Sequence, residues 1–264
     1  LDPTTEAHAR RTIVEFLARE GFRTGRRRVH LVSYPRSGNT LTRAYFSILQ
    51  GRIQRSVYDG DVVRASGPAL TSALDHLDIV KSHQMPAVDG AMIYLIRDGR
   101  NATLSFLYMA YLFGGHKFSQ LSQVYDAIRH LDDTEGSWAD HLAQAVRQSG
   151  TRPTLFIRHE DLVRDPEATL DAMIRFMDAE VPAEVIGACV RSHHASDDYG
   201  DNPRNGYLYE PEPNSIYDLL KRHRHDDYWR HIFDARSRRY FHEAGGTEYL
   251  LRFGYEGAAD WWRE

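Results

Sequence analysis

VHLVSYPRSGNTLTRAYFSIL, residues 29–49, is the stretch that decides the fold of this chain. Its apolar, β-branched start predicts a buried strand over 29–34, and Pro35 stops that strand. Apolar residues then recur at helical spacing over 41–49, which predicts a helix. Backbone N–H groups at a helix start have no partner inside the helix, and the helix dipole makes that end partly positive. The strand, turn and helix therefore predict a cradle for phosphate or sulfate.

The turn between this strand and helix supplies further donors to an anion. Arg36 contributes a full positive charge, and the rest of the turn consists of Ser37, Gly38, Asn39 and Thr40. It lacks the Gly-Lys pair of the GxxxxGK[ST] loop, so the Mg²⁺-and-lysine chemistry of nucleoside triphosphatases is not encoded there. The alternative is a plain strand-to-helix turn that Ser37 or Asn39 caps.

The bulk composition favours one soluble cytoplasmic domain over residues 1–264. A chain of 264 residues can bury one substantial core, and its formal net charge of -4 provides no basic field for nucleic acid. The single cysteine, Cys189, excludes a disulfide within the chain, which suits a reducing compartment. Apolar runs fall short of the ~20 residues of a membrane span, and the first residues lack a signal-peptide pattern. We therefore expect neither a nucleic-acid partner nor a membrane span.

Further along the chain, predicted strands alternate with predicted helices. Apolar runs predict strands at 77–81, 91–96 and 154–158. This alternation predicts an α/β fold, a parallel sheet flanked by helices in a single domain with a P-loop-like turn. Ligands of such sheets bind at the carboxyl ends of the strands. One shared site is expected there, at the positions of Arg36, His83, Arg97 and His159.

Two motifs resemble a known family. The segment YPRSGNTL, residues 34–41, is similar to the 5′-phosphosulfate loop, roughly YPKSGTTW, of sulfotransferases that use 3′-phosphoadenosine-5′-phosphosulfate (PAPS). Lys81-Ser82-His83 resembles the family's Lys-Thr-His segment. The resemblance implies that residues 36–40 hold the 5′-phosphosulfate, that His83 is the general base, and that Lys81 and Arg36 stabilise the transferring group. From the residues alone, His83 is either a base or an ordinary surface or core histidine.

Three later motifs extend the resemblance. Ser105 follows Arg97 by eight residues, the spacing of the family's 3′-phosphate motif, which implies that both bind that phosphate. A salt bridge from Arg97 to Asp98 at a helix cap is the alternative. The segment HEDL from His159 resembles the family's Tyr-Glu-Asp-Leu, and KRHR, residues 221–224, resembles a late basic segment that also grips the 3′-phosphate. The latter implies roles for Arg222 and Lys221.

The chain departs from the family pattern at three positions. Arg36 replaces a common catalytic lysine, which keeps the charge but changes bulk and makes the charge permanent. Leu41 and His159 replace a Trp and a Tyr that often stack on adenine. Adenine recognition is therefore open, with His159 a candidate for stacking.

From about residue 29 to residue 229, the resemblance predicts a PAPS-dependent sulfotransferase. It would transfer a sulfuryl group to a hydroxyl or amine of a small-molecule acceptor and release 3′-phosphoadenosine-5′-phosphate (PAP). We expect no metal requirement, because Lys and Arg supply the positive charge and the sequence has no HExxH or clustered Cys/His ligands. An ATP-dependent small-molecule kinase on a related fold and a non-catalytic nucleotide-binding module remain alternatives. Acceptor identity, the register of the late basic segment and oligomeric state stay open.

The segments outside these motifs also carry sequence patterns. Residues 1–28 are expected to form an N-terminal helix and a basic solvated linker. Residues 194–215, rich in Asp, Asn, Gly and Pro, are long enough to predict a lid loop over the acceptor site. Residues 229–251 show helical patterning, and Trp261 and Trp262 are expected to pack against the body. Aromatic residues that could line an acceptor pocket are Phe106, Tyr108, Tyr111, Tyr199, Tyr207 and Tyr209.

Overall fold

The computed structural model describes residues 26–58, 63, 67–114, 120–195, 216, 218–219 and 227–263. The chain divides into two compact units. The first comprises residues 1–33, 38–95 and 148–196, and the second comprises residues 34–37, 96–147 and 197–264.

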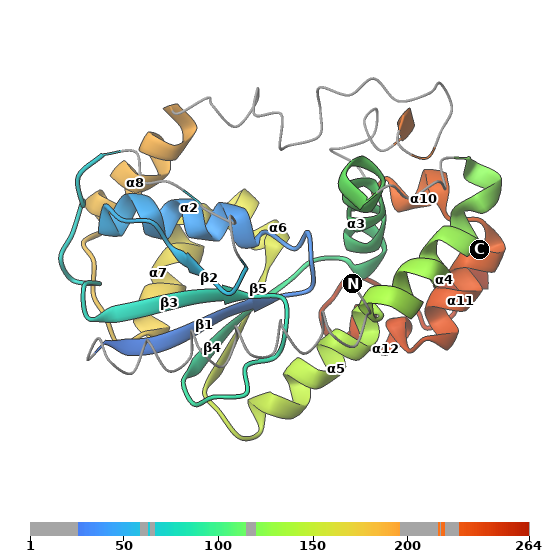
Figure 1. Cartoon of the computed structure of the whole chain (residues 1–264), viewed down its shortest axis with the longest axis horizontal. Coiled ribbons are helices and arrows are strands. Elements are labelled where there is room, and N and C mark those ends of the chain that lie inside the picture. The colour runs from blue at the N-terminus through green and yellow to red at the C-terminus, as the bar shows by residue number, and fades with distance from the viewer. Residues whose placement is uncertain are drawn as a thin grey trace. The chain divides into compact units, whose positions relative to one another are not determined.

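A five-stranded sheet forms the centre of the first unit, in the order β2-β3-β1-β4-β5 (Figure 1). The strands are β1 Arg27–Ser33, β2 Arg55–Ser56, β3 Leu77–Ser82, β4 Ala91–Ile96 and β5 Thr154–Arg158. β1 pairs in parallel with both β3 and β4, and β2 pairs in parallel with β3. All residues of β3 and β4 are buried, as expected for parallel strands covered on both faces. The predicted α/β fold with a parallel sheet flanked by helices is confirmed.

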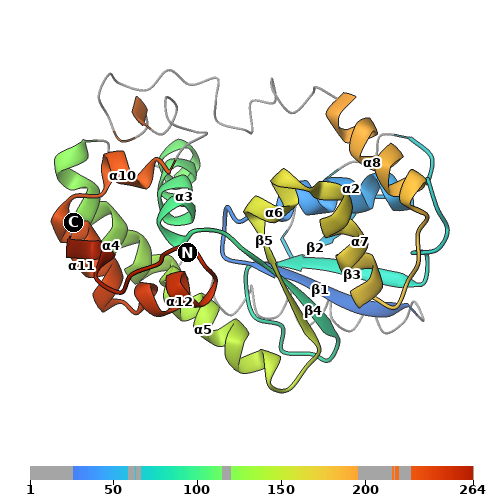
Figure 2. The same cartoon turned by 180° about the vertical axis from the view of Figure 1, so that it is seen from behind.

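Among the described residues of the first unit, four helices accompany the sheet (Figures 1 and 2). They are α2 Asn39–Gln50, α6 His159–Arg164, α7 Pro166–Phe176 and α8 Ala183–Ala195. α8 packs against both α2 and α7. Alternate residues of β1, Val29 and Leu31, join one hydrophobic cluster with side chains of these helices. The cluster includes Cys189, whose Sγ donates to the carbonyl of Tyr45 at 3.4 Å, and burial raises the pKa of this thiol to about 12.

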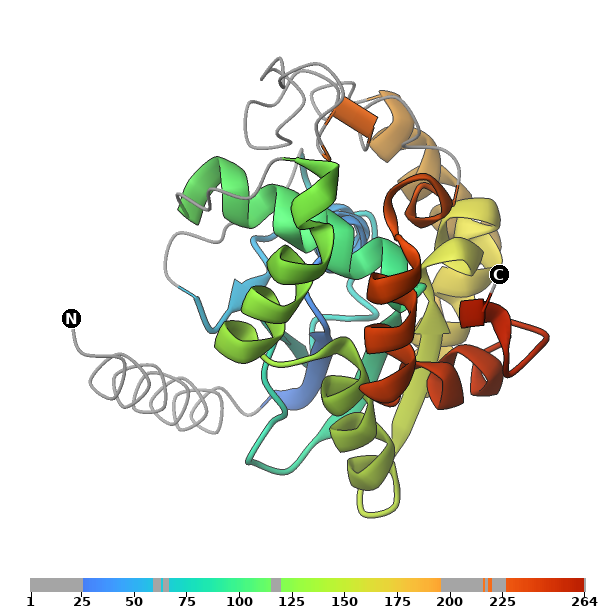
Figure 3. The same cartoon turned by 90° about the vertical axis from the view of Figure 1, so that its right-hand side faces the viewer.

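The second unit is helical. In its described residues, the elements are α3 Gly99–Gly114, η1 Leu121–Gln123, α4 Val124–Glu135, α5 Trp138–Ser149, α10 Trp229–Ile232, α11 Ala235–Glu243, α12 Gly246–Arg252 and η4 Trp261–Arg263. Figure 3 shows the C-terminal helices in red, where α11 packs against α4 and α12. Aromatic rings fill its core: Trp138 stacks on Phe241 at 5.7 Å, and Trp261 meets Trp229 edge-on at 5.5 Å.

Most predicted elements are present, with differences at their ends. The strands predicted at 91–96 and 154–158 have those bounds. The helical patterning over 229–251 corresponds to the three short helices α10, α11 and α12, and the two-residue β2 was not predicted. Trp261 is buried and donates to Thr247 at 2.9 Å, so its predicted packing against the body is confirmed.

The basic stretch before β1 differs from the expectation of a linker. Arg27 and Arg28 are the first residues of β1. Arg28 pairs with the buried carboxylate of Asp78 at 3.0 Å, and Arg55 pairs with the same oxygen at 2.9 Å. A buried carboxylate requires such partners, so these arginines belong to the sheet. The predicted N-terminal helix lies outside the described residues.

Membrane-spanning helices and clusters of metal-ligating side chains are both absent from the part of the chain that the structure describes. None of its helices has both the length and the apolar character that crossing a bilayer requires. That same part contains no group of three or more His, Cys, Asp and Glu side chains placed to hold a metal ion.

The buried histidine of β1 should make stability depend on pH. His30 is 5% exposed and its Nε2 lies 3.2 Å from the carbonyl of Asp89; burial lowers its pKa from 6.5 to about 4. The unfolded chain therefore binds a proton that the folded protein resists. The free energy of unfolding should not depend on this group above about pH 6.5, and should fall by roughly 3 kcal/mol as the pH drops to about 4.

Urea denaturation of wild type and His30→Gln at several pH values between 7.5 and 4 checks this expectation. The variant should lose that part of the pH dependence, because Gln does not titrate. His76→Gln is the matched control, since His76 is exposed in the turn just before β3. Identical pH dependence in wild type and His30→Gln would contradict the prediction.

Candidate active site

The turn from β1 into α2 leaves a helix start without a side-chain cap. Gly38 is the N-cap of α2, and no side chain in the described part of the chain caps it. Asn39 instead donates its Nδ2 back toward β1, to the carbonyl of Leu31 at 3.4 Å and to Ser33 Oγ at 3.2 Å. The alternative in which Ser37 or Asn39 caps the helix is therefore wrong, and the first N–H groups of α2 are left for another acceptor.

The hydroxyl of Ser37 is a second feature of this turn that favours an anion site. Ser37 is 1% exposed, and its Oγ has no hydrogen-bond partner among the residues that the structure describes. A buried hydroxyl without a partner costs about 1–3 kcal/mol. Thr40, in contrast, is exposed in the first turn of α2. A hydroxyl and the uncapped N–H groups of a helix start are the donors that an oxyanion requires.

Gly38 is required at its position for two reasons. Its φ of 96° lies in the left-handed region, which side chains disfavour. A Cβ on Gly38 would also lie 2.7 Å from Cδ2 of His159, which begins α6 after β5. The structure therefore places the predicted site residue His159 directly beside the cradle.

His83 lies at the end of β3 with a defined orientation. Its Nδ1 is 2.9 Å from the carbonyl oxygen of Ser33, an acceptor only, so Nδ1 carries the proton. The lone pair of the neutral ring is then on Nε2. β1 and β3 end in register, with Val32 opposite Ser82, so this end of the sheet holds the cradle and His83 together.

Tyr58 connects the two predicted catalytic residues of this segment. Its hydroxyl accepts the backbone N–H of His83 at 3.1 Å, and the Nζ of Lys81 lies 4.6 Å from its ring centroid. Lys81 is 8% exposed, and the cation–π contact helps to hold its charge there. Tyr58 belongs to the irregular stretch after α2, where no periodicity in the sequence distinguishes it.

Three further predicted residues meet in the second unit. Arg36 adopts a left-handed φ of 68°, and its carbonyl accepts a hydrogen bond from Arg97 Nη1 at 3.1 Å. The Nε of Arg36 donates to Ser105 Oγ at 3.1 Å. Asp98 pairs with Arg100 at 2.5 Å, so the alternative salt bridge from Arg97 to Asp98 does not form. Arg97, Ser105 and Arg36 therefore form one cluster.

Some predicted site residues lie outside the described residues. These are Arg222 and Lys221, together with residues 196–215 of the expected lid loop; residues 194–195 end α8. Of the aromatic acceptor candidates, Phe106 packs edge-on against Tyr34 at 5.8 Å and Tyr108 is 8% exposed.

Substitution of Gly38 tests the close approach of His159. Gly38→Ala should lower the free energy of unfolding through both left-handed strain, about 1–2 kcal/mol, and the contact with His159. Gly245→Ala is the matched control: Gly245 is also a helix N-cap with φ 86°, but its Cβ would meet only Ala139 Cβ at 3.9 Å. Thermal and urea unfolding should show a larger loss for Gly38→Ala.

The excess loss should disappear when His159→Ala is the background, because the ring is then gone. An equal cost of Gly38→Ala in the presence and absence of the His159 ring would show that the two residues do not interact.

Sequence comparisons with known proteins match the chain to one family. A family model described as the sulfotransferase domain matches residues 26–249. Human sulfotransferase 1E1 is 23% identical over 207 residues, which cover 69% of either chain. Dog sulfotransferase 1B1 is 22% identical over 205 residues, with the same 69% coverage of each chain.

Solved structures show the same fold. Mouse sulfotransferase SULT7A1, complexed with PAP, superposes with a TM-score of 0.56 at 17% identity, covering 86% of this chain and 85% of that chain. Retinol dehydratase in complex with androsterone and inactive cofactor PAP gives a TM-score of 0.53 at 16% identity, covering 85% and 80%. With a family match that spans most of its length, this chain belongs to the sulfotransferase family.

Proposed function

We propose that the protein transfers a sulfuryl group from PAPS to a hydroxyl or amine of a small-molecule acceptor, and that PAP is the product. The observation that carries this proposal is the uncapped start of α2, which follows a buried Ser37 hydroxyl that has no hydrogen-bond partner among the described residues. Together these donors form a cradle for an oxyanion. Family membership supports the proposal, as do the complexes of PAP with SULT7A1 and retinol dehydratase, which share this fold.

In this proposal, residues 36–40 hold the 5′-phosphosulfate. The absence of a Cβ at Gly38 lets the backbone approach the anion closely. The Ser37 hydroxyl and the first N–H groups of α2 donate to its oxygens, while Arg36 supplies a permanent positive charge.

Arg97 and Ser105 bind the 3′-phosphate in the proposal. The planar guanidinium of Arg97 offers several donors in a fork that suits a phosphate. The Oγ of Ser105 accepts from Arg36, which leaves its own hydrogen to donate to an anionic oxygen. We also propose that Arg222 and Lys221 contribute to this phosphate, and that His159 contributes to adenine binding.

His83 is the general base of the proposed transfer. The Ser33 carbonyl holds Nδ1–H, so Nε2 can take the proton of the acceptor hydroxyl. The acceptor oxygen then attacks sulfur in line, and the bond from sulfur to the bridging phosphate oxygen breaks. Arg36, Lys81 and the backbone N–H groups of the cradle stabilise the charge on the sulfuryl oxygens and the leaving phosphate.

The rival functions make different predictions. A kinase would need ATP with Mg²⁺, and the missing Gly-Lys pair at the cradle speaks against it. A non-catalytic module would bind PAP without any transfer. A cytoplasmic location is part of the proposal, since a single cysteine leaves no disulfide within the chain.

Calorimetric titration with PAP tests the nucleotide. Wild type should bind PAP without metal, and Arg97→Ala should weaken binding by roughly 30-fold or more, as expected for a lost charged hydrogen-bond pair. Arg164→Ala is the control, because that side chain is 78% exposed and pairs with Asp161. Binding of ATP with Mg²⁺ in preference to PAP would overturn the proposal and favour the kinase.

Turnover tests the base. His83→Ala should lose about 10²-fold or more in transfer from radiolabelled PAPS to a panel of phenols, alcohols and primary amines, while the Kd for PAP stays unchanged. His130→Ala, at an exposed position of α4, should behave as wild type. Near-normal turnover in His83→Ala would remove this histidine from the mechanism.

A further inference from the structure

Within the described residues, two contacts fix the orientation of the Arg97 guanidinium. One edge donates from Nη1 to the carbonyl of Arg36 at 3.1 Å. Its Cζ lies over the ring of Tyr228, 5.8 Å from the centroid, within the range of a cation–π contact. Because a guanidinium is planar, a fixed edge and a ring together define the direction of its remaining donors.

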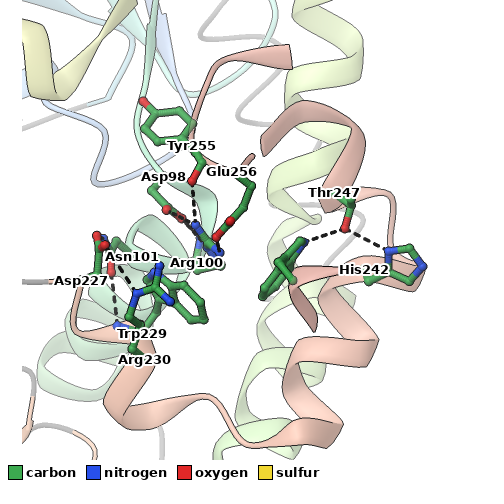
Figure 4. Close-up of polar contacts among 11 residues, drawn as sticks. Asp98, Arg100, Asn101, Asp227, Trp229, Arg230, His242, Thr247, Tyr255 and Glu256 are labelled. Atoms are coloured by element: carbon green, nitrogen blue, oxygen red, sulfur yellow. Dashed lines mark hydrogen bonds and ion pairs between the residues drawn. The ribbon is translucent and has the colours of Figure 1, made fainter. Parts of the chain in front are cut away.

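Tyr228 is itself fixed by the first turn of α3. It is 4% exposed, and its hydroxyl donates to the carbonyl of Asn101 at 2.7 Å. The side chain of Asn101 binds both neighbours of Tyr228: Oδ1 accepts the Trp229 N–H at 3.3 Å, and Nδ2 donates to Asp227 at 3.5 Å (Figure 4). One residue of α3 thus holds residues 227–229.

Arg100 reinforces this attachment from the next position of α3. Its guanidinium lies 3.8 Å from the ring centroid of Trp229 and 4.6 Å from that of Trp261. It is 1% exposed and pairs with both Asp98 and Glu256 (Figure 4). A buried charge with two carboxylate partners and two aromatic faces is costly to displace, so residues 227–229 form a rigid support.

We propose that Tyr228 is a positioning residue for the 3′-phosphate: it sets the plane of the Arg97 guanidinium, and Asn101 sets Tyr228. The inference rests on the proposed function, because it assumes that Arg97 binds this phosphate. Bidentate recognition of phosphate depends on the angle of the fork, so a rotated Arg97 loses affinity for the 3′-phosphate while the rest of the nucleotide is unaffected. Tyr228 therefore contributes to discrimination between nucleotides that carry and lack a 3′-phosphate.

The experiment compares PAP with adenosine 5′-phosphate, which lacks only the 3′-phosphate. Calorimetry with the full chain gives the ratio of the two Kd values for wild type, Tyr228→Leu and Tyr228→Phe. Tyr228→Leu should reduce the ratio about three- to tenfold, the scale of a cation–π contact to a half-buried arginine, and change the Kd for adenosine 5′-phosphate by less than about twofold. Tyr228→Phe keeps the ring and should keep most of the discrimination.

Three further variants separate a positioning role of Tyr228 from a role in stability. Tyr125→Leu removes another tyrosine of the second unit that lies beneath an arginine, Arg236 at 3.6 Å, and should leave the ratio unchanged. In the Arg97→Ala background, Tyr228→Leu should have no additional effect on the ratio, because the proposed influence of Tyr228 on the 3′-phosphate passes through Arg97. Tyr228→Met fills the site without a ring and carries the same expectation if Tyr228→Leu fails to fold.

The possible results distinguish failure of this inference from failure of the proposed function. Loss of discrimination in both Arg97→Ala and Tyr228→Leu, with rescue in Tyr228→Phe, supports the inference. A parallel loss of affinity for both nucleotides in Tyr228→Leu, or an unchanged ratio, overturns it even while Arg97→Ala sustains the proposed function. A wild type that binds PAP no more tightly than adenosine 5′-phosphate overturns both.

Discussion

The turn between β1 and α2 is the constraint on which the rest of the site depends. The chain must leave a buried strand and begin a helix whose first N–H groups have no side-chain cap among the described residues. Two left-handed residues within three positions, Arg36 at φ 68° and Gly38 at φ 96°, achieve this. Such a conformation at a residue with a side chain costs about 1–2 kcal/mol, which surrounding contacts must offset. Arg97 does so at Arg36 by binding its carbonyl.

Each unit also contains a buried charge that organises its neighbours. In the first unit, Asp78 in β3 binds Arg28 of β1 and Arg55 of β2, so one carboxylate joins three strands. In the second, Arg100 joins the start of α3 to the aromatic residues near the C-terminus. Buried ion pairs add little net stability, but removing one partner leaves an unpaired charge, which makes these arrangements specific.

Much of the fold could be predicted from the sequence because its central strands are continuous apolar runs. β4 has the predicted bounds, since it is a fully buried apolar run, as expected for a parallel strand covered on both faces. β5, a half-buried strand at the sheet edge, also has its predicted bounds, because its apolar residues form a short run between Pro153 and the polar segment from Arg158. β2 was missed because two polar residues at a sheet edge carry no periodic pattern. Arg27 and Arg28 were assigned to a linker because their partners, Asp178 and Asp78, are distant in the chain.

In the candidate site, too, local sequence patterns predict some residues, and only tertiary contacts identify the others. The cradle, His83 and Arg97 were predictable because each directly follows an identifiable strand. Tyr58 and Tyr228 were not, because their roles come from contacts with residues more than twenty positions away, to His83 and to Asn101. The residues proposed to bind ligand therefore lie in local sequence patterns, whereas the residues that contact those side chains from elsewhere in the chain are identified only by tertiary contacts.

The burial of the single cysteine has a practical consequence. Cys189 lies in the cluster between α8 and α2, and its raised pKa keeps it almost entirely as the unreactive thiol at neutral pH. Any reaction with a thiol reagent then requires the separation of these helices. With one cysteine in the whole sequence, the rate of labelling is an intrinsic reporter of opening in the first unit, obtained without an engineered probe.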